Sequence, residues 1–339
     1  MPGVNAWKSS NFLMVVSLRD RRSGCFFLEF INLHGFTMHD LLNKKKLTLL
    51  VTDSGLGGLS ICARMVRNLT RAGSVANLSV VYFNAWPLQD KGYNFLDGDA
   101  QRIKVFGNAL SSMNRYAPDL IFIACNTLSL VFRQGALAAT ARAPVVDIIN
   151  FGVEMIADRL NATPSGMALI LGTKTTVASG AHKKRLVDGG IAGHRIVQQD
   201  CHGLAGAIEN DPDGPQVQAL VDHFMARAAA TMDPDVDRIH AALCCTHYGY
   251  IQDVIRKSLV RQTGATVDII DPNRAMSDTV CAEPGRDRVP SPKPEIQVFS
   301  RVRLSPQKVN AIAARVDGVS PETAGALRES RYLPDLFDV

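Results

Sequence analysis

The feature that most constrains the fold is a repeated pattern that begins at residue 47: a short apolar run, a small or polar turn, then a segment of helical length. Eight such runs occur, at residues 47–52, 78–83, 120–124, 145–149, 168–171, 195–197, 239–243 and 266–270. Continuous apolar strands that alternate with helices are typical of a parallel sheet covered on both faces. The pattern therefore predicts an α/β fold, in which ligands bind beyond the carboxyl ends of the strands.

Polar residues follow four of these runs at the predicted strand ends. The motif DSGLGG occupies residues 53–58, and GTKTT occupies 172–176. Two further motifs, CNT at 125–127 and CTHY at 245–248, each place a cysteine directly after an apolar strand, 120 residues apart. We therefore expect two similar α/β halves, each presenting a cysteine to a shared cleft.

The charge distribution gives no indication of a nucleic-acid partner. The net charge is +5, and residues 1–46 contribute seven basic against three acidic side chains. The main body is therefore nearly neutral, without the basic excess that nucleic-acid binding requires. No stretch approaches the ~18 apolar residues of a transmembrane helix, so we expect no membrane partner either. Seven cysteines, an odd number at wide spacing, are unlike a disulfide framework and favour a cytoplasmic location.

Residues 1–46 lie outside the repeated pattern and are expected to form an extra N-terminal segment. Their apolar stretch at 11–18 is short and is followed by charged residues at 19–22, which disfavours a secretory signal. Three alternatives stay open for this segment: disorder, an organellar transit peptide, or residues upstream of a native start at Met38. Residues 284–294, rich in proline and charge, predict a surface linker, and residues 305–330 predict a helix packed on the first domain.

Cys125 and Cys245 are the candidate catalytic residues. A thiolate at the start of a helix is stabilised by the helix dipole and by nearby N–H groups. Cys244 is expected to point to the opposite face of its strand from Cys245, whereas His247 is expected on the side of Cys245. Two thiols that flank one small substrate suit stereoinversion at carbon, in which one removes a proton and the other delivers one. The ordinary cysteine pKa of ~8.5 allows both roles.

Other chemistries are disfavoured but stay open from the residues alone. Residues 53–58 lack the Lys-Ser/Thr of a P-loop, and we interpret their glycines as bringing main-chain N–H groups close to a small anion. Asp53 then serves as a proton-handling or amine-binding group and Ser54 as a hydroxyl donor. A Cys–His hydrolase with His247 as base leaves the second cysteine without a role.

A metal site is the remaining alternative, and the candidate ligands lack the usual C-x2-C or H-x3-H spacing. The candidate ligands are Cys201, His202, Cys245 and His247.

The four motifs, in this order, resemble those of the glutamate racemase family within the cofactor-independent aspartate/glutamate racemase superfamily. The resemblance runs from about residue 47 to about residue 271. It implies two Rossmann-like domains facing each other across an active-site cleft. It also implies an amino-acid racemase without pyridoxal phosphate or metal, which makes D-glutamate for cell-wall peptidoglycan.

The resemblance implies a role for each matching residue. Cys125 and Cys245 are the two bases, assisted by Asp53 and His247, and Glu209 supports the second side. The residues implied to bind the carboxylates and ammonium of the substrate are Asp53, Ser54, Asn126, Thr127, Thr173, Thr176, Thr246 and His247.

One loop departs from the family. Where the family has a Gly-Asp-Thr-Ala-Arg run and then Pro-Tyr-Gly, this chain has NAWP at 84–87 and GYN at 92–94. We take Gly92 and Tyr93 as the substrate-contacting equivalents. His182 replaces a usual tyrosine, and Gly249 a usual proline.

Glutamate is the expected substrate, because the aspartate enzymes tend to carry a glutamate where this chain has His247. The alternatives are aspartate or another small carboxylic acid, and a catalytically silent amino-acid-binding homologue. We expect a first domain formed by residues 47–147 and about 262–330 and a second formed by 148–261. The expected partner is a small-molecule amino acid; the oligomeric state is open, with a homodimer as one alternative.

Overall fold

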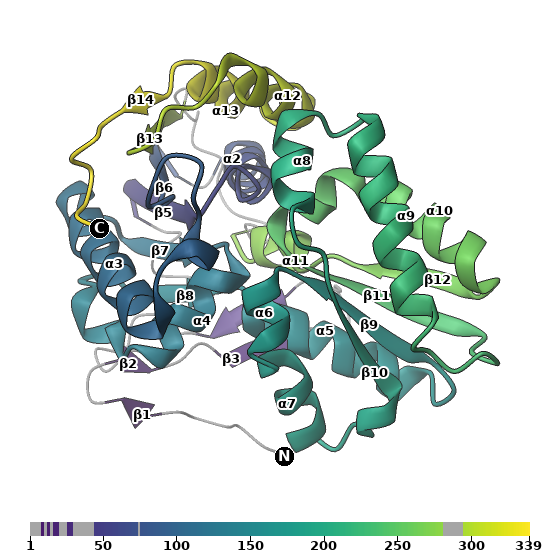
Figure 1. Cartoon of the computed structure of the whole chain (residues 1–339). Coiled ribbons are helices and arrows are strands. Elements are labelled where there is room, and N and C mark those ends of the chain that lie inside the picture. The colour runs from purple at the N-terminus through teal and green to yellow at the C-terminus, as the bar shows by residue number, and fades with distance from the viewer. Residues whose placement is uncertain are drawn as a thin grey trace.

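The computed structural model describes residues 44–73, 75–280 and 294–339, with the backbone of four short strands before residue 30 (Figure 1). Those four strands form two antiparallel pairs. They are β1 (Lys8–Ser9), β2 (Phe12–Leu13), β3 (Val16–Arg19) and β4 (Phe26–Glu29). The other residues before residue 44, Cys25 among them, lie outside the described residues, as do Cys281 and the predicted linker up to residue 293.

A six-stranded parallel sheet forms the first half, in the order β14-β13-β6-β5-β7-β8. Its strands are β5 (Lys46–Asp53), β6 (Asn77–Asn84), β7 (Leu120–Ile123), β8 (Val145–Asp147), β13 (Glu295–Ser300) and β14 (Arg331–Tyr332). Alternate residues of β5 face opposite sides of the sheet, so Leu49 and Val51 enter one apolar core and Leu50 enters the other. Both faces are therefore covered, as predicted for a parallel sheet.

The helices of this half lie on both faces of the sheet. One face packs against α2 (Leu59–Ala72), α11 (Pro272–Asp278), α12 (Pro306–Asp317) and α13 (Pro321–Arg328). The other packs against α3 (Gly98–Met113) and α4 (Asn126–Gln134). The predicted packing of residues 305–330 on the first half is thus confirmed, with Ile312 and Leu327 fully buried.

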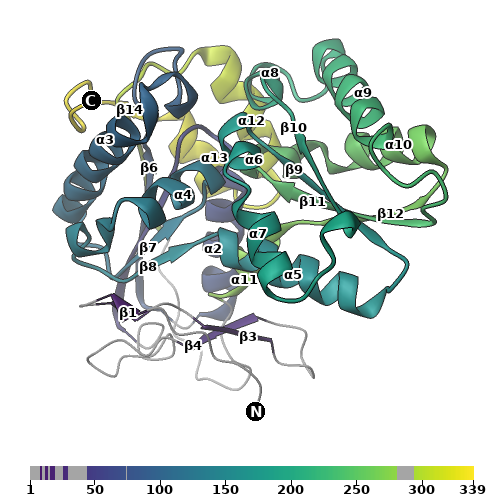
Figure 2. The same ribbon diagram turned by 60° about the horizontal axis from the view of Figure 1, so that its bottom comes forward.

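A four-stranded parallel sheet forms the second half, in the order β10-β9-β11-β12. Its strands are β9 (Met167–Gly172), β10 (Ile196–Asp200), β11 (Arg238–Cys244) and β12 (Thr266–Ile270). Figure 2 shows this sheet between two helix layers. The first layer holds α8 (Leu204–Asn210), α9 (Pro215–Ala229) and α10 (Gln252–Thr263), and the second holds α5 (Ile149–Ala162) and α7 (Ala181–Asp188).

The two halves repeat one topology. Numbered within each half, β6-β5-β7-β8 and β10-β9-β11-β12 share the order 2-1-3-4. The third strand of each half, β7 or β11, is the one followed by a catalytic cysteine candidate. The predicted α/β class with two similar parallel-sheet halves is therefore confirmed.

Two details of the predicted organisation require correction. Residues 266–270 pair in parallel with β11, so the second unit extends to residue 270 instead of ending at 261. Strand β13 was not among the predicted runs, because polar Glu295 and Gln297 interrupt its apolar residues. It nevertheless pairs with β6 in the first sheet.

No helix among the described residues has the length and apolarity needed to cross a membrane.

Candidate active site

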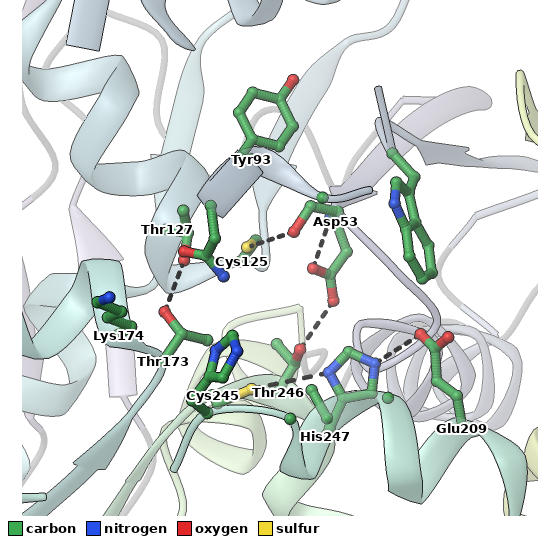
Figure 3. A pocket seen from close by; sticks show the side chains of 18 of the residues that line it. Asp53, Tyr93, Cys125, Thr127, Thr173, Lys174, Glu209, Cys245, Thr246 and His247 are labelled. Carbon is green, nitrogen blue, oxygen red and sulfur yellow. Dashed lines mark hydrogen bonds and ion pairs between the residues drawn. The ribbon is translucent and has the colours of Figure 1, made fainter. Parts of the chain in front are cut away.

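The polar strand ends of both halves meet at one cavity of about 340 Å³. Figure 3 shows the side chains that line it. Every predicted site residue except Thr176 lies in its wall. The wall residues predicted from the sequence are Asp53, Ser54, Gly92, Tyr93, Cys125, Asn126, Thr127, Thr173, Glu209, Cys245, Thr246 and His247.

Cys125 enters the cavity from the first half. It stands at the N-cap of α4, two residues beyond the end of β7, and its Sγ lies 3.3 Å from Ser54 Oγ. Burial and the neighbouring charge of Asp53 hold the pKa of the Cys125 thiol well above its ordinary value. The thiol form of Cys125 is therefore favoured near neutral pH.

Cys245 enters the cavity from the second half and heads a chain of three polar groups. It precedes the 3-10 helix η5 (Thr246–Ile251), and its Sγ lies 3.7 Å from His247 Nδ1. His247 Nε2 lies 2.8 Å from Glu209 Oε1. Burial lowers the pKa of His247, but the bonds to Cys245 and Glu209 outweigh it and place that pKa well above its ordinary value. An imidazolium at this position stabilises a neighbouring thiolate.

Glu209 is the buried carboxylate at the end of this chain. Burial tends to raise its pKa, but the bond to His247 and the charges of His247 and Lys308 bring the pKa below its ordinary value. Glu209 Oε1 also accepts the Leu56 N–H at 2.8 Å. The resemblance to the family placed Glu209 here, and the structure brings it into contact with His247.

Asp53 is fixed by three donors and connects the two halves. Its carboxylate accepts the N–H groups of Ser54 and Gly58, each at 2.6 Å. Thr246 from the second half donates its hydroxyl to the same carboxylate at 2.8 Å. The buried Asp53 side chain is thereby held beside Cys125 from both sides of the cavity.

The glycines at 55–58 allow the two halves to approach closely. A Cβ on Gly57 would lie 2.3 Å from Thr246 Oγ1, and one on Gly55 would lie 2.7 Å from Glu209 Oε1. The expectation that these N–H groups bind a small anion needs correction. The N–H groups of Leu56 and Gly58 are taken by the side-chain carboxylates of Glu209 and Asp53.

A cluster of donors lies opposite Asp53, at the amino ends of α4 and α6 (Lys174–Ala178). The hydroxyls of Thr127, Thr173 and Thr176 lie 3.0–3.4 Å apart. Thr176 supports the other two from behind the wall. Asn126 Nδ2 is buried and has no hydrogen-bond partner among the described residues. Helix amino ends, hydroxyls and an unsatisfied amide together suit a carboxylate.

The divergent loop after β6 also contributes to the wall. Gly92, Tyr93 and Trp86 line the cavity. The ring of Tyr93 packs edge-on against Phe106, and its hydroxyl points away from the other labelled side chains (Figure 3). Tyr93 therefore presents its backbone and ring to the cavity instead of its hydroxyl.

Cys244 occupies the other side of β11, as predicted. It is fully buried in the apolar cluster that contains Ala242, whereas Cys245 joins the cluster of Leu243. Part of Cys244 also completes the cavity wall. Among the described residues, no group of three or more His, Cys, Asp or Glu side chains is arranged to hold a metal ion.

Sequence reasoning missed several residues of the wall, among them Lys308, which makes an ion pair with Glu209. Lys308 comes from α12, beyond the matched motifs, and its Nζ lies 3.2 Å from Glu209 Oε2. Trp86 and Lys174 also line the cavity, as does His202, which the sequence had suggested only as a metal ligand. Lys174 and His202 each lie two residues beyond a strand end, which is a signal that the sequence did contain. No local pattern marks Lys308.

Comparison with known proteins agrees with this geometry. The sequence model of the Asp/Glu/hydantoin racemase family matches residues 56–279. A glutamate racemase of Nitratiruptor is 27% identical over 209 residues, covering 60% of this chain and 73% of the relative. One from Clostridium perfringens is 27% identical over 222 residues, covering 65% and 76%.

Solved structures share the fold. The crystal structure of glutamate racemase from Francisella tularensis in complex with D-glutamate aligns with a TM-score of 0.59 at 20% identity. The alignment covers 81% of this chain and 95% of that chain. The family match spans more than half of the chain, so the protein belongs to the Asp/Glu/hydantoin racemase family and is a racemase, an isomerase.

Proposed function

We propose that the protein interconverts L- and D-glutamate by proton transfer between two cysteines, without pyridoxal phosphate or metal. The observation that carries this proposal is the convergence of Cys125 and Cys245, from equivalent strands of the two halves, on one cavity. The names of the relatives support glutamate as the substrate. The loop at 84–94, which we take to contact the substrate, differs from that of the family. The predicted alternative substrates, aspartate or another small carboxylic acid, are therefore tested in the same assay.

The site contains the groups that each end of the substrate requires. Asn126 and the hydroxyls of Thr127 and Thr173 surround the position proposed for a carboxylate, which carries negative charge as the α-proton leaves. Asp53 supplies the negative charge for the substrate ammonium. Ser54 and Thr246, which contact Cys125 and Asp53, complete the polar wall between the two thiols.

Each turnover moves two protons. One thiolate takes the α-proton, so that the C–H bond breaks, an S–H bond forms and the electron pair stays on the α-carbon. The opposite thiol then gives its proton to the other face, which forms the new C–H bond and leaves a thiolate. Cys125 and Cys245 have exchanged protonation states, and the reverse reaction restores them.

In the free enzyme the two cysteines lie in different electrostatic surroundings, which favour Cys245 as the base and Cys125 as the acid. Cys125 is held as a thiol by burial and by Asp53, while Cys245 has the His247 imidazolium beside it, with Nδ1 3.7 Å from its Sγ. Binding of a substrate ammonium beside Asp53 offsets the negative charge that raises the pKa of Cys125. We therefore infer that Cys125 becomes a base only with substrate bound.

We further infer that the cleft lies between two domains, one formed by residues 46–147 with 272–280 and 294–339, and the other by residues 149–270. The product D-glutamate would serve peptidoglycan synthesis in the cytoplasm.

The decisive experiment is circular-dichroism turnover of L- and D-glutamate and L- and D-aspartate, without added cofactor and after chelator treatment. The wild type should racemise glutamate. Cys125→Ser and Cys245→Ser should each lose about 10²–10⁴-fold in kcat/KM in both directions, because a serine hydroxyl does not act as base near neutral pH.

Cys62→Ala is the matched control, since Cys62 is a buried thiol of the α2 core; its kcat/KM should stay within about twofold. The alanine variants distinguish the two faces of the α-carbon. Cys125→Ala should exchange solvent deuterium into one enantiomer only, and Cys245→Ala into the other enantiomer only. Normal racemisation by both serine variants would refute the two-cysteine mechanism. A wild type that binds amino acids without deuterium exchange would indicate the silent homologue.

A further inference from the structure

Lys308 reaches the cavity from a helix that lies outside the matched motifs. Its Nζ lies 3.2 Å from Glu209 Oε2 and 4.6 Å from the centre of the Trp86 ring. The Lys308 side chain is 18% exposed and that of Glu209 only 2%. The ammonium group is thus held between a buried carboxylate and an aromatic face, both of which attract a cation.

The position of Lys308 in its helix makes this contact informative. Ser305 caps α12 by accepting the Lys308 N–H, so Lys308 lies in the first turn. A cation there is opposed by the positive end of the helix dipole. The ion pair with Glu209 supplies the compensating interaction.

The second carboxylate oxygen of Glu209, Oε2, has Lys308 as its ion-pair partner. Oε1 accepts hydrogen bonds from the Leu56 N–H and from His247 Nε2. Oε2 is buried and accepts no hydrogen bond among the described residues, so its ion pair with the Lys308 ammonium, 3.2 Å away, is the contact that balances it. The carboxylate is therefore held by three groups from three segments, and Lys308 is the one that belongs to α12.

We propose that Lys308 is a positioning residue for racemisation, which fixes the orientation and charge of Glu209 and, through it, the His247–Cys245 side of the site. This inference rests on the proposed two-cysteine racemase. It deepens that function by assigning a role to α12, which lies beside α8 of the second half (Figure 1).

The surrounding charges determine the direction of the expected effect. The buried titratable groups around this chain are Asp53, Tyr82, Cys201, Tyr248 and Tyr250, none of which is a cation. Lys174 and His202 also line the cavity, but the ion pairs of Glu209 are made by His247 and Lys308. Removal of the Lys308 charge therefore leaves the Glu209 charge acting fully on His247, so the pKa of His247 rises.

The test compares the pH profile of kcat/KM in the wild type, Lys308→Met and Lys308→Arg. Lys308→Met should shift the limb that follows the titration of His247 upward by about one pH unit. It should also lower kcat/KM about tenfold at pH 7, because Glu209 loses one of the groups that orient it. Lys308→Arg should return the limb to the wild-type position. Both reaction directions must change together in kcat/KM, because the enantiomers have equal free energy in solution.

Arg315→Met is the matched control. Arg315 is also on α12 and makes an ion pair with Asp213, 2.5 Å away, just beyond α8. The Arg315→Met variant therefore tests the docking of α12 on the second half without changing a contact of Glu209. The limbs of its pH profile should stay at the wild-type positions. If the limbs of the kcat/KM pH profile lie at the same pH in Lys308→Met and Arg315→Met, the proposal is overturned. A higher KM for both enantiomers with unshifted limbs would also overturn it and make Lys308 a substrate anchor.

A second measurement does not require catalysis. The imidazole ¹⁵N signals of His247, identified by their loss in His247→Gln, should titrate about one pH unit higher in Lys308→Met than in the wild type. An unchanged titration would refute the role of Lys308 even in an active enzyme. An inactive wild type with the shifted titration would refute the proposed function and leave the Lys308–Glu209–His247 coupling standing.

Discussion

At the residue scale, the hydroxyl of Tyr93 is buried and has no hydrogen-bond partner among the described residues. Burial and the nearby Cys125 hold its pKa well above the ordinary value, so it stays neutral. A buried hydroxyl without a partner costs about 1–3 kcal/mol of desolvation. Removal of that hydroxyl should therefore cost nothing in stability.

Tyr93→Phe should leave KM for glutamate within about twofold and keep or raise the free energy of unfolding by up to about 1 kcal/mol. Tyr93→Ala should lose the ring packing against Phe106, at about 3–5 kcal/mol, and should raise KM because the loop that lines the cavity loses its anchor. Urea denaturation and initial-rate kinetics measure both effects. A tenfold higher KM in Tyr93→Phe would show that the hydroxyl contacts substrate.

At the element scale, the turn between β5 and α2 packs directly on η5. This contact brings Asp53 to Thr246 and Leu56 to Glu209. It exists because Gly57 has no side chain: a Cβ there would come within 2.7 Å of the His247 main-chain nitrogen. The two halves therefore keep this close contact only while residue 57 is glycine.

Gly57→Ala should force the turn away from η5, lowering kcat/KM at least about tenfold and destabilising the fold by about 1–3 kcal/mol. The matched control is Gly325→Ala, because Gly325 lies within α13 and a Cβ there meets nothing within 4 Å. That change should be neutral or stabilising by up to about 1 kcal/mol. Equal kinetics of the two variants, measured by circular dichroism, would contradict the close-approach explanation.

At the scale of the whole molecule, the buried Glu209–His247 pair makes stability depend on pH. The folded pKa of His247 is raised above its ordinary 6.5, so its contribution is complete below 6.5 and is lost as the pH rises through the folded value. The folded pKa of Glu209 is lowered from 4.5, so its contribution is complete above 4.5 and is lost on acidification. The pair therefore stabilises most between about pH 4.5 and 6.5.

The difference in unfolding free energy between the wild type and Glu209→Gln should accordingly be largest near pH 6 and smaller near pH 9. Glutamine keeps the shape of the side chain and removes its charge, so the variant isolates the electrostatic contribution. Urea denaturation at the two pH values gives the difference directly. A difference that stays constant across this range would exclude the charged pair as the cause.

The sequence alone determined the class of fold and most of the site. Apolar runs that alternate with helical segments require a parallel sheet, and the carboxyl ends of parallel strands lie at one edge. Residues that follow those strands, such as Asp53, Cys125, Thr173 and Cys245, therefore had to converge wherever the two halves faced each other. This inference needs only local periodicity, and for that reason it could be made without coordinates.

The tertiary structure alone decided which distant segments complete the site. Lys308 touches Glu209 because α12 packs beside α8 of the second half, and nothing in the local sequence of either residue encodes that approach. The same holds for the direction of the Tyr93 hydroxyl and for the pairing of β12 with β11. Such contacts depend on how whole surfaces fit together, which periodicity and motif spacing do not specify.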